Sequence, residues 1–328
     1  MKKRTIAIVC GGDSSEFEVS LRSAQGIQTF LDKNRYNPYI VELHGLDWHV
    51  VLKTGRKVAV DRNDFSFEER KRRKTFDFAY IIIHGTPGEN GILQGYFDLL
   101  GIPYSGCGVL ASAMTFHKFT CNQYLKGFGV RVADSVFIRH GFKIDADEVI
   151  DKVGLPCFVK PDADGSSFGI SKVKTKEQFL PAMEKAFAEG GDVVVESFVA
   201  GTEVTCGCYK TSSKEVVFPL TEVVTSNEFF DYDAKYNGQV DEITPARIPE
   251  ETAERIRLLT STIYDIMGCS GIIRIDYIIT PDGKINLIEV NTTPGMTATS
   301  FIPQQVRAAD LDIKDVLTEI IEEKIQRP

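Results

Sequence analysis

Four polar residues in the C-terminal part of the chain have the types and spacing of a site for a divalent cation. They belong to the segment 271–296, GIIRIDYIITPDGKINLIEVNTTPGM. Two apolar runs flank the turn sequence Pro281-Asp282-Gly283, which predicts a β-hairpin. Successive side chains of a strand alternate between faces, so one face carries the four polar residues for either of two loop lengths: Arg274, Asp276, Glu289 and Asn291. The other face is expected to be core and carries Ile273, Ile275, Ile279, Ile288 and Val290.

Carboxylate and amide oxygens are the ligands that Mg²⁺ and Mn²⁺ prefer. Glu289 is predicted to lie opposite Asp276 and could bridge two ions, with Asp276 on one side and Asn291 on the other. Mg²⁺ usually takes further ligands from substrate phosphates, and Arg274 could hold a transferring phosphoryl group. The alternative is a solvated hairpin face with ordinary charges. The nearby turn Thr293-Pro294-Gly295, where a ligand can approach, favours the metal site.

Length and composition limit the class of protein. A chain of 328 residues is too long for one small core and predicts two or three domains. Its net charge of −8 argues against nucleic-acid binding, and no apolar run approaches the ~18 residues of a membrane span. Seven cysteines without a regular framework are expected to be buried thiols in a reducing cytoplasm. The charged run 68–74, EERKRRK, is expected to be a solvated helix face.

The N-terminal third has the pattern of an α/β fold. A strand at 5–10 is followed by the glycine-rich loop 11–15 and a helix at 16–31, an arrangement that binds small anionic ligands. Glu16 would bind a substrate amino group, or simply favour the start of the helix. Further parallel strands are predicted at 39–43 and 78–83. The second strand leads into another glycine-rich loop, HGTPGENG, at 84–91.

The middle of the chain has features of a nucleotide site. A helix predicted at 109–126 carries Lys118, and a buried strand at 158–161 carries Lys160. An unpaired buried ammonium is costly, so Lys160 needs a partner, and a nucleotide phosphate would serve. The loop 162–169, which contains Ser166, could fold over phosphates. Two glutamates near strand ends could bind adenine or ribose, or be plain surface charges: Glu196 and Glu203.

The last third is expected to contain an active-site lid and the central hairpin. The polar, aromatic stretch 225–243 is predicted to be the lid, with Lys235 and Tyr236 as phosphate and substrate contacts. Helices are predicted at 250–267 and from residue 313 onward.

Six motifs, taken in this order, carry a family resemblance. They are GGDSSEFEVS (11–20), HGTPGENG (84–91), VKPDADGSSFG (159–169), FDYDAKY (230–236), RID (274–276) and EVNTTPGM (289–296). Over nearly its whole length the chain resembles the D-alanine–D-alanine ligases of the ATP-grasp superfamily. The resemblance implies an α/β fold of three-domain ATP-grasp architecture with an N-terminal parallel α/β (pre-ATP-grasp) domain. The expected domains are 1–105, 106–200 and 201–328.

The resemblance also implies a reaction. The carboxylate of one D-alanine attacks the γ-phosphate of ATP to give an acyl phosphate, and the amine of a second D-alanine then displaces phosphate. D-alanyl-D-alanine would serve the synthesis of peptidoglycan precursors in the cytoplasm. The implied cofactors are ATP and two Mg²⁺ (or Mn²⁺), and the implied assembly is a homodimer.

The family's motifs assign roles to residues of this chain. Glu16 should bind the amino group of the first D-alanine, and Ser166 and Tyr236 should link the lid to it. Arg274 and the Gly295 backbone N–H should form the oxyanion site, and Ser300 should meet the carboxylate of the second substrate. ATP phosphates should meet Lys118, Lys160 and Lys235, whereas Glu196 and Glu203 should lie by adenine and ribose. The metal ligands should be Asp276, Glu289 and Asn291.

Three alternative functions are compatible with parts of this pattern or must be excluded. Within the fold, a D-alanine–D-lactate ligase is the nearest alternative, and Tyr236 indicates the dipeptide-forming type. An ATP-binding regulatory protein should have lost Arg274 or a metal carboxylate, and this chain keeps them. A nicotinamide-dependent dehydrogenase is excluded because G-x-G-x-x-G is absent. The chain departs from the family pattern at four positions: Asn90, His117, Asp164 and Phe230.

Overall fold

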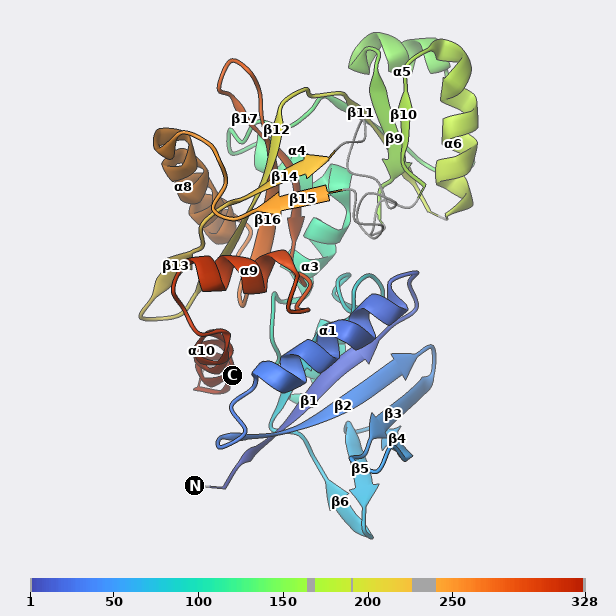
Figure 1. The fold of residues 1–328 in the computed structure, drawn as a ribbon. Coiled ribbons are helices and arrows are strands. Elements are labelled where there is room, and N and C mark those ends of the chain that lie inside the picture. Colours follow the sequence, from blue (N-terminus) through green and yellow to red (C-terminus); the bar gives the residue numbers. More distant parts are fainter. Residues whose placement is uncertain (1, 164–168, 190, 226–239, 327–328) are drawn as a thin grey trace.

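Three β-sheets follow one another along the chain (Figure 1). The computed structural model describes residues 2–163, 169–189, 191–225 and 240–326. The first sheet has the strand order β6-β5-β4-β3-β2-β1-β7, and the second has the order β10-β9-β11-β8. The third has the order β15-β14-β12-β16-β17, with β13 paired to β12.

The first sheet has a parallel centre, as predicted. β1 (Arg4–Gly11) pairs in parallel with β2 (Tyr36–His44) and β7 (Phe78–Ile81), and α1 (Phe17–Phe30) connects β1 to β2. Residues 6–10 of β1 are fully buried, because helices cover one face of the sheet and an aromatic cluster covers the other. The ends of β1 and β7 therefore bring the two glycine-rich loops to the same edge of the sheet.

The rest of the first sheet is an antiparallel extension that the sequence analysis missed. Its strands are β3 (Asp47–Val51), β4 (Lys57–Asp61), β5 (Ser66–Glu69) and β6 (Arg72–Lys74). The prediction of a helix at 68–74 is wrong, because β5 and β6 form a tight hairpin there. Arg70 and Lys71 make its turn with φ of 52° and 60°, a left-handed conformation that a helix does not contain. α2 (Ile92–Leu100) completes this part of the chain.

The second sheet begins after two short helices. The single helix predicted at 109–126 is instead α3 (Val109–Phe116) and α4 (Lys118–Lys126), broken at His117, whose φ of −91° and ψ of 100° are extended. The sheet's elements are β8 (Ser135–Ile138), α5 (Ala146–Val153), β9 (Cys157–Pro161), β10 (Ser171–Val173), the 3₁₀ turn η1 (Lys176–Gln178), α6 (Phe179–Ala188) and β11 (Val193–Ser197). α5 and α6 cover one face of this sheet (Figure 1).

The third sheet contains the predicted hairpin. Its strands are β12 (Thr202–Lys210), β13 (Glu215–Val217), β14 (Thr221–Thr225), β15 (Val240–Ile243), β16 (Ile273–Ile279) and β17 (Ile285–Asn291). α8 (Glu250–Ile266) packs on this sheet, and α9 (Phe301–Ala308) and α10 (Ile313–Gln326) follow it. The predicted strands and helices of this region are confirmed in the described residues.

One apolar cluster, here called the shared core, joins the first and last parts of the chain. It packs residues of β1, α1 and β7 against residues of α9 and α10, and includes Ile8, Ile27, Ile302 and Leu317. Gly26 of α1 lies so close to the chain after β17 that an added Cβ would stand 2.2 Å from the carbonyl oxygen of Met296. The first sheet and the C-terminal helices therefore form one packed body (Figure 1).

Candidate active site

The β16–β17 hairpin has one of the two pairings that the sequence left open for its polar residues. Asp276 pairs with Glu289, and Arg274 pairs with Asn291. The guanidinium of Arg274 donates two hydrogen bonds to the carboxylate of Asp276, from Nε at 2.9 Å and from an Nη at 2.7 Å. Asn291 donates its amide nitrogen to the same carboxylate at 3.1 Å. The four polar side chains therefore share one face, as expected.

A β-bulge between Asp276 and Tyr277 changes the core side of the hairpin. Tyr277 pairs with Leu287, and both side chains are buried in the core of the third sheet. The prediction of Ile288 as a core residue is wrong: it is only partly buried and lies outside this cluster. The bulge lets the apolar side stay packed while Asp276 and Glu289 remain directly opposite each other.

Arg274 is held as a fixed cation at this site. Its side chain is 13% exposed, and its guanidinium lies 5.2 Å from the ring centre of Phe301 at the start of α9. Burial opposes the charged form, but the carboxylates of Asp276, Glu289 and Glu89 outweigh that penalty and raise the pKa of Arg274. A planar, permanently charged donor in a buried position is suited to stabilising negative charge that develops on a substrate.

The donor set on the hairpin fits a hard divalent cation. Asp276 and Glu289 supply carboxylate oxygens on adjacent strands. Because Asn291 gives its amide nitrogen to Asp276, its carbonyl oxygen is available for another partner. Within the described parts of the chain, no three His, Cys, Asp or Glu side chains gather as a metal site by themselves. A cation here would therefore need the amide oxygen and ligands from a bound phosphate, as Mg²⁺ commonly does.

The two glycine-rich loops of the first sheet are locked together beside the hairpin. Ser14 donates its hydroxyl to the carbonyl oxygen of His84 at 2.7 Å, and the Asp13 backbone N–H donates to Thr86 at 2.9 Å. Gly85 has a φ of 74°, and an added Cβ would stand 2.8 Å from Ser14. Only glycine allows this approach, so the loop after β7 is held against the loop that starts α1.

Glu89 is a site residue that the sequence analysis did not single out. Its carboxylate accepts a hydrogen bond of 2.7 Å from the Gly85 backbone N–H. Burial, followed by repulsion from Glu16 and Glu289, raises its pKa to about 8, although the Gly85 N–H and Lys118 oppose the rise. These interactions connect residues of the first loop, the second loop, α4 and the hairpin. Glu16, Glu289 and Lys118 therefore all act on the carboxylate of Glu89.

The raised pKa of Glu89 predicts how stability depends on pH. The carboxyl binds its proton more tightly in the folded than in the unfolded chain, so its contribution to stability is complete below about 4.5 and is lost as the pH rises to about 8. We expect Glu89→Gln to flatten the fall of the melting temperature over this range, measured on the ligand-free protein by calorimetry. Glu18→Gln, an exposed change on α1, is the matched control. An equally steep fall in Glu89→Gln would contradict the assignment.

The structure brings Gly295 and Ser300 together. An added Cβ on Gly295 would stand 3.0 Å from the hydroxyl of Ser300. The Ser300 hydroxyl also lies 2.8 Å from the hydroxyl of Thr297, and it accepts a hydrogen bond of 3.1 Å from the Thr297 backbone N–H. Because Ser300 directly precedes α9, the N-terminus of this helix faces the same place.

Lys118 is the first residue of α4, and Asp162 holds that helix end. One carboxylate oxygen of Asp162 accepts the Phe119 backbone N–H at 2.7 Å, and the other lies 2.9 Å from Nδ1 of His117. The Asp162 carbonyl oxygen accepts the Lys118 N–H at 3.0 Å. His117, a departure from the family pattern, is thus a partner of a carboxylate at 1% exposure. No local pattern predicts this pairing, because 45 residues separate the partners.

Loss of the Asp162 carboxylate should disturb nucleotide binding as well as stability. We expect Asp162→Ala to destabilise the chain by about 1 kcal/mol, as loss of a helix cap does, and to raise the KM for ATP because Lys118 loses its support. The matched control is Asp145→Ala. Asp145 caps α5 by accepting from Asp147 and Glu148 at 3.0 and 3.3 Å, away from the site. An equal rise of KM in both variants would refute the positioning role.

The buried lysine of the second sheet has a protein partner. Lys160 and Glu196 lie on the neighbouring strands β9 and β11, and their Nζ and Oε2 atoms are 2.7 Å apart. Oε1 of Glu196 is buried and has no hydrogen-bond partner among the described residues. A buried acceptor without a donor is costly, so it is suited to a ligand that brings an N–H group. Glu203, at the start of β12, is half-buried and pairs with Ile278 of β16.

Three predicted site residues lie outside the described residues: Ser166, Lys235 and Tyr236. The same holds for Asp164 and Phe230.

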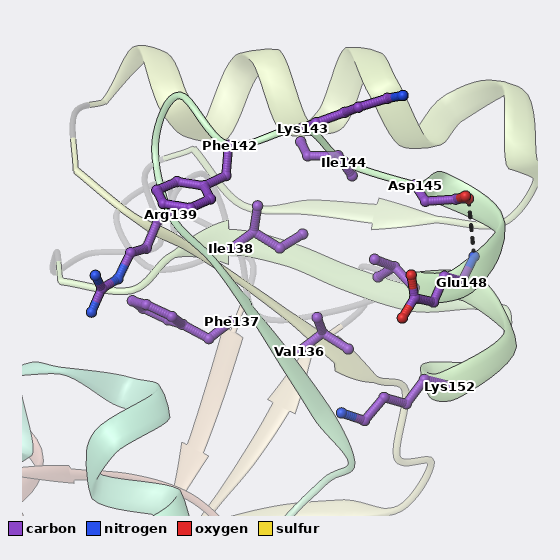
Figure 2. Close-up of a pocket in the computed structure, with 11 residues that line it drawn as sticks. Val136, Phe137, Ile138, Arg139, Phe142, Lys143, Ile144, Asp145, Glu148 and Lys152 are labelled. Atoms are coloured by element: carbon purple, nitrogen blue, oxygen red, sulfur yellow. Dashed lines mark hydrogen bonds between the residues drawn. The ribbon is translucent and has the colours of Figure 1, made fainter.

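A separate hollow lies on the second sheet, away from these residues. Figure 2 shows it between β8, the segment 139–145 and α5, with Asp145 bonded to Glu148 at its rim. It has a volume of about 400 Å³ and is lined by apolar side chains with both signs of charge. It contains none of the predicted site residues. In the described part of the chain, no helix has the length and apolar character needed to cross a bilayer.

Two family models cover most of the chain. The model described as D-ala D-ala ligase N-terminus matches residues 5–107, and the model described as D-ala D-ala ligase C-terminus matches residues 124–322. Among curated proteins, the D-alanine–D-alanine ligase of Phocaeicola vulgatus is 73% identical over 98% of this chain and 99% of its own. The ligase of Bacteroides fragilis is 68% identical over the same shares.

Solved structures agree with this result. D-alanyl-alanine synthetase A from Vibrio cholerae has a TM-score of 0.90, with 32% identity over 100% of both chains. The VanG D-Ala:D-Ser ligase from Enterococcus faecalis has a TM-score of 0.87, with 32% identity over 98% of this chain and 100% of its own. A D-alanine–D-alanine ligase from Bacillus anthracis, complexed with ATP, has a TM-score of 0.79, with 29% identity over 98% of both. The predicted α/β class and ATP-grasp fold are confirmed, and the chain belongs to the D-alanine–D-alanine ligase family.

Proposed function

We propose that this enzyme joins two D-alanines into D-alanyl-D-alanine at the expense of ATP, by way of an acyl phosphate, for the synthesis of peptidoglycan precursors in the cytoplasm. One observation carries the proposal: the cation Arg274, the carboxylates of the hairpin and those of the two glycine-rich loops face one another. Both steps of such a ligation build negative charge on oxygen. A buried arginine between carboxylates that can hold cations is suited to stabilising it.

The residues of the first and third sheets would bind the two substrates. Glu16 would hold the amino group of the first D-alanine beside the helix start of α1. Arg274 and the Gly295 backbone N–H would stabilise the oxyanion of the tetrahedral intermediate, and Ser300 at the N-terminus of α9 would bind the second carboxylate. Because Gly295 and Ser300 are adjacent, one loop would align the second substrate with the acyl phosphate.

ATP would lie between the second and third sheets. Lys118 and Lys160 would contact its phosphates, and Glu196, whose Oε1 is buried without a partner among the described residues, would accept a hydrogen bond from the adenine amino group. Glu203 would bind ribose. Two Mg²⁺ or Mn²⁺ ions held by Asp276, Glu289 and Asn291 would neutralise phosphate charge. We further propose that Lys235 contacts the ATP phosphates and that Ser166 and Tyr236 link the lid to Glu16.

The test is a product assay. Purified protein, ATP and Mg²⁺ are incubated with D-alanine, with L-alanine, and with D-alanine plus D-lactate or D-serine, while phosphate release is measured and products are separated by mass. We expect phosphate release and D-alanyl-D-alanine from D-alanine alone. ATP binding without turnover of D-alanine would refute the ligase proposal and favour an ATP-binding regulator.

The second candidate function is the ligation of D-alanine to a different second substrate. The similarity to a D-Ala:D-Ser ligase shows that this fold occurs with a different second substrate, so preferential D-alanyl-D-serine formation in the competition assay would replace the first proposal. D-alanyl-D-lactate as the main product would indicate the depsipeptide-forming type instead.

We also propose that the chain divides into domains at 1–105, 106–200 and 201–328 and forms a homodimer. Each sheet falls within one of these spans, which supports the division. Several apolar side chains are exposed on α2 and α3: Ile92, Leu99 and Leu110. An exposed apolar patch is typical of an interface, so we expect light scattering to give twice the mass of one 36.5 kDa chain. A monomer at micromolar concentration would contradict the dimer.

A further inference from the structure

Two cysteines from distant parts of the sequence meet where the first sheet connects to the rest of the chain. Cys107 lies between the last bridge of the first sheet, at Tyr104, and the start of α3. Cys269 lies between α8 and β16, five residues before Arg274. Their side chains are within hydrogen-bonding reach of each other. Neither residue is part of the proposed catalytic or nucleotide-binding machinery.

The backbone holds the two cysteines together independently of their thiols. The Ser270 hydroxyl donates to the Gly106 carbonyl oxygen at 2.7 Å. An added Cβ on Gly271 would stand 2.7 Å from the Gly106 nitrogen, so the segments 106–108 and 269–271 are in direct contact. Sγ of Cys107 accepts a hydrogen bond of 3.4 Å from the Ser270 backbone N–H, and the Cys107 thiol donates one of 3.5 Å to the Ser270 carbonyl oxygen. The two cysteines therefore lie on segments that are held against each other, which is the placement that a disulfide between them needs.

The surroundings of Cys107 favour a thiolate. The hydrogen bond from Cys269 lowers its pKa, burial opposes this, and the Ser270 N–H and the ammonium of Lys324 lower it further. Lys324 lies 5.6 Å from the ring centre of Tyr104, on the same side of the connection. Cys107 itself is buried, at 1% exposure, in the core of the third sheet, whereas Cys269 is partly buried, so a small molecule would reach the pair from the Cys269 side.

Five other cysteines share the burial of Cys107 but not the direction of its pKa shift. Burial raises the pKa of all five, and they lie in apolar cores: Cys10, Cys121, Cys157, Cys206 and Cys208. Cys206 and Cys208, which lie two residues apart on β12, both point into the core of the third sheet. Such thiols are poor nucleophiles, because the thiolate is the reactive form.

We propose that Cys107 and Cys269 are a redox-active dithiol that a hydroperoxide converts into an intramolecular disulfide. The Cys107 thiolate attacks one peroxide oxygen, the O–O bond breaks, and the leaving hydroxide takes up a proton to become water. Cys269 then loses its proton and attacks the sulfenic sulfur of Cys107, and the departing hydroxide leaves as a second water. With hydrogen peroxide, two thiols lose two electrons and the oxidant is reduced to two waters.

The test is the order in which the seven cysteines of the reduced, full-length chain react with increasing hydrogen peroxide. After each dose, remaining thiols are alkylated in denaturant, and the peptides are mapped by mass spectrometry without reduction. We expect the first product to be a Cys107–Cys269 linked peptide pair, with a loss of about 2 Da from the intact monomer that dithiothreitol reverses. If another cysteine is modified first, or if Cys107 and Cys269 oxidise without linking, the proposal is overturned.

Single substitutions give a second readout. In Cys269→Ser, Cys107 should stop at the sulfenic acid and be trapped by dimedone, whereas Cys107→Ser should give neither the trap nor the link. Cys208→Ala is the matched control, because it removes a buried core thiol, and the link should form as in the unchanged chain. A link that persists in Cys107→Ser, through any other cysteine, would also overturn the proposal.

Discussion

Glu289→Gln should lower kcat by about 10²–10³-fold while ATP still binds. The change keeps the size of the side chain but removes one negative charge from the donor set opposite Asp276. A neutral amide is a weaker ligand for a divalent cation, and the charge that develops on the transferring phosphoryl group would then be less neutralised. The measurement is phosphate release at saturating ATP and D-alanine, together with a titration of Mn²⁺ binding by electron paramagnetic resonance.

The matched control is Asp282→Asn in the turn of the same hairpin. Asp282 is exposed and pairs with Lys284 at 2.7 Å, so the control also turns a carboxylate into an amide but does so far from the polar face. We expect near-normal turnover and Mn²⁺ affinity for it. If Glu289→Gln retained the Mn²⁺ affinity of the unchanged chain, the assignment of this residue as a metal ligand would have to be abandoned.

The second large effect is expected for Arg274→Lys, with a fall in kcat of about 10²-fold. Lysine keeps the charge but cannot reproduce the two parallel hydrogen bonds that Arg274 makes to Asp276 at 2.9 and 2.7 Å. Its ammonium would therefore not be held in the position that the developing oxyanion needs. Steady-state kinetics at saturating substrates would show the loss in kcat rather than in the KM for ATP.

Two further variants separate chemistry from folding. Arg274→Met leaves Asp276 buried without its cation, and breaking such a pair costs about 3–5 kcal/mol, so the melting temperature should fall well below that of Arg274→Lys. Arg255→Lys on α8 is the control, because Arg255 is exposed and donates to the Gly283 carbonyl oxygen near the turn, at 3.4 Å. Unchanged kcat in Arg274→Lys, with a normal fold, would show that charge alone suffices at this position.

The polar face of the hairpin could be predicted from sequence for either of two registers, because two independent signals agree on it. The turn Pro281-Asp282-Gly283 limits the loop length, and the alternation of apolar and polar residues fixes the faces. The bulge could not be predicted, because one extra residue leaves no mark on a short segment such as Ile285–Ile288. Because of the bulge, Leu287 and not Ile288 fills the core position opposite Tyr277.

Two segments were predicted less well: the charged run 68–74 and the helical region 109–126. The run 68–74 contains no apolar residue that could give a period, so a helix and a hairpin were indistinguishable, and the hairpin is set by partners in β4. No glycine or proline in the sequence marks the break between α3 and α4. It arises because Asp162, far along the chain, accepts hydrogen bonds at the start of α4.

The candidate site shows the same division between local and distant information. The polar hairpin face was readable because its spacing is local. Glu89 was not singled out, because its significance lies in its nearness to Glu16 and Glu289, which depends on how the glycine-rich loops interlock. The partner of Lys160 was expected to be a phosphate, whereas the structure gives it Glu196. A ligand would then meet an ion pair and not a lone ammonium.

The shared core has a consequence for how the chain folds during synthesis. One face of the first sheet is covered by residues that all precede position 105, so it can be completed early. The other face packs α1 against α9 and α10, and the last of these ends at Gln326. While the ribosome is still making the middle of the protein, Ile27 and its neighbours on that face have no permanent cover. Such nascent apolar surface is where chaperones bind and where growing chains aggregate. Completion of the N-terminal fold therefore waits for the synthesis of α9 and α10.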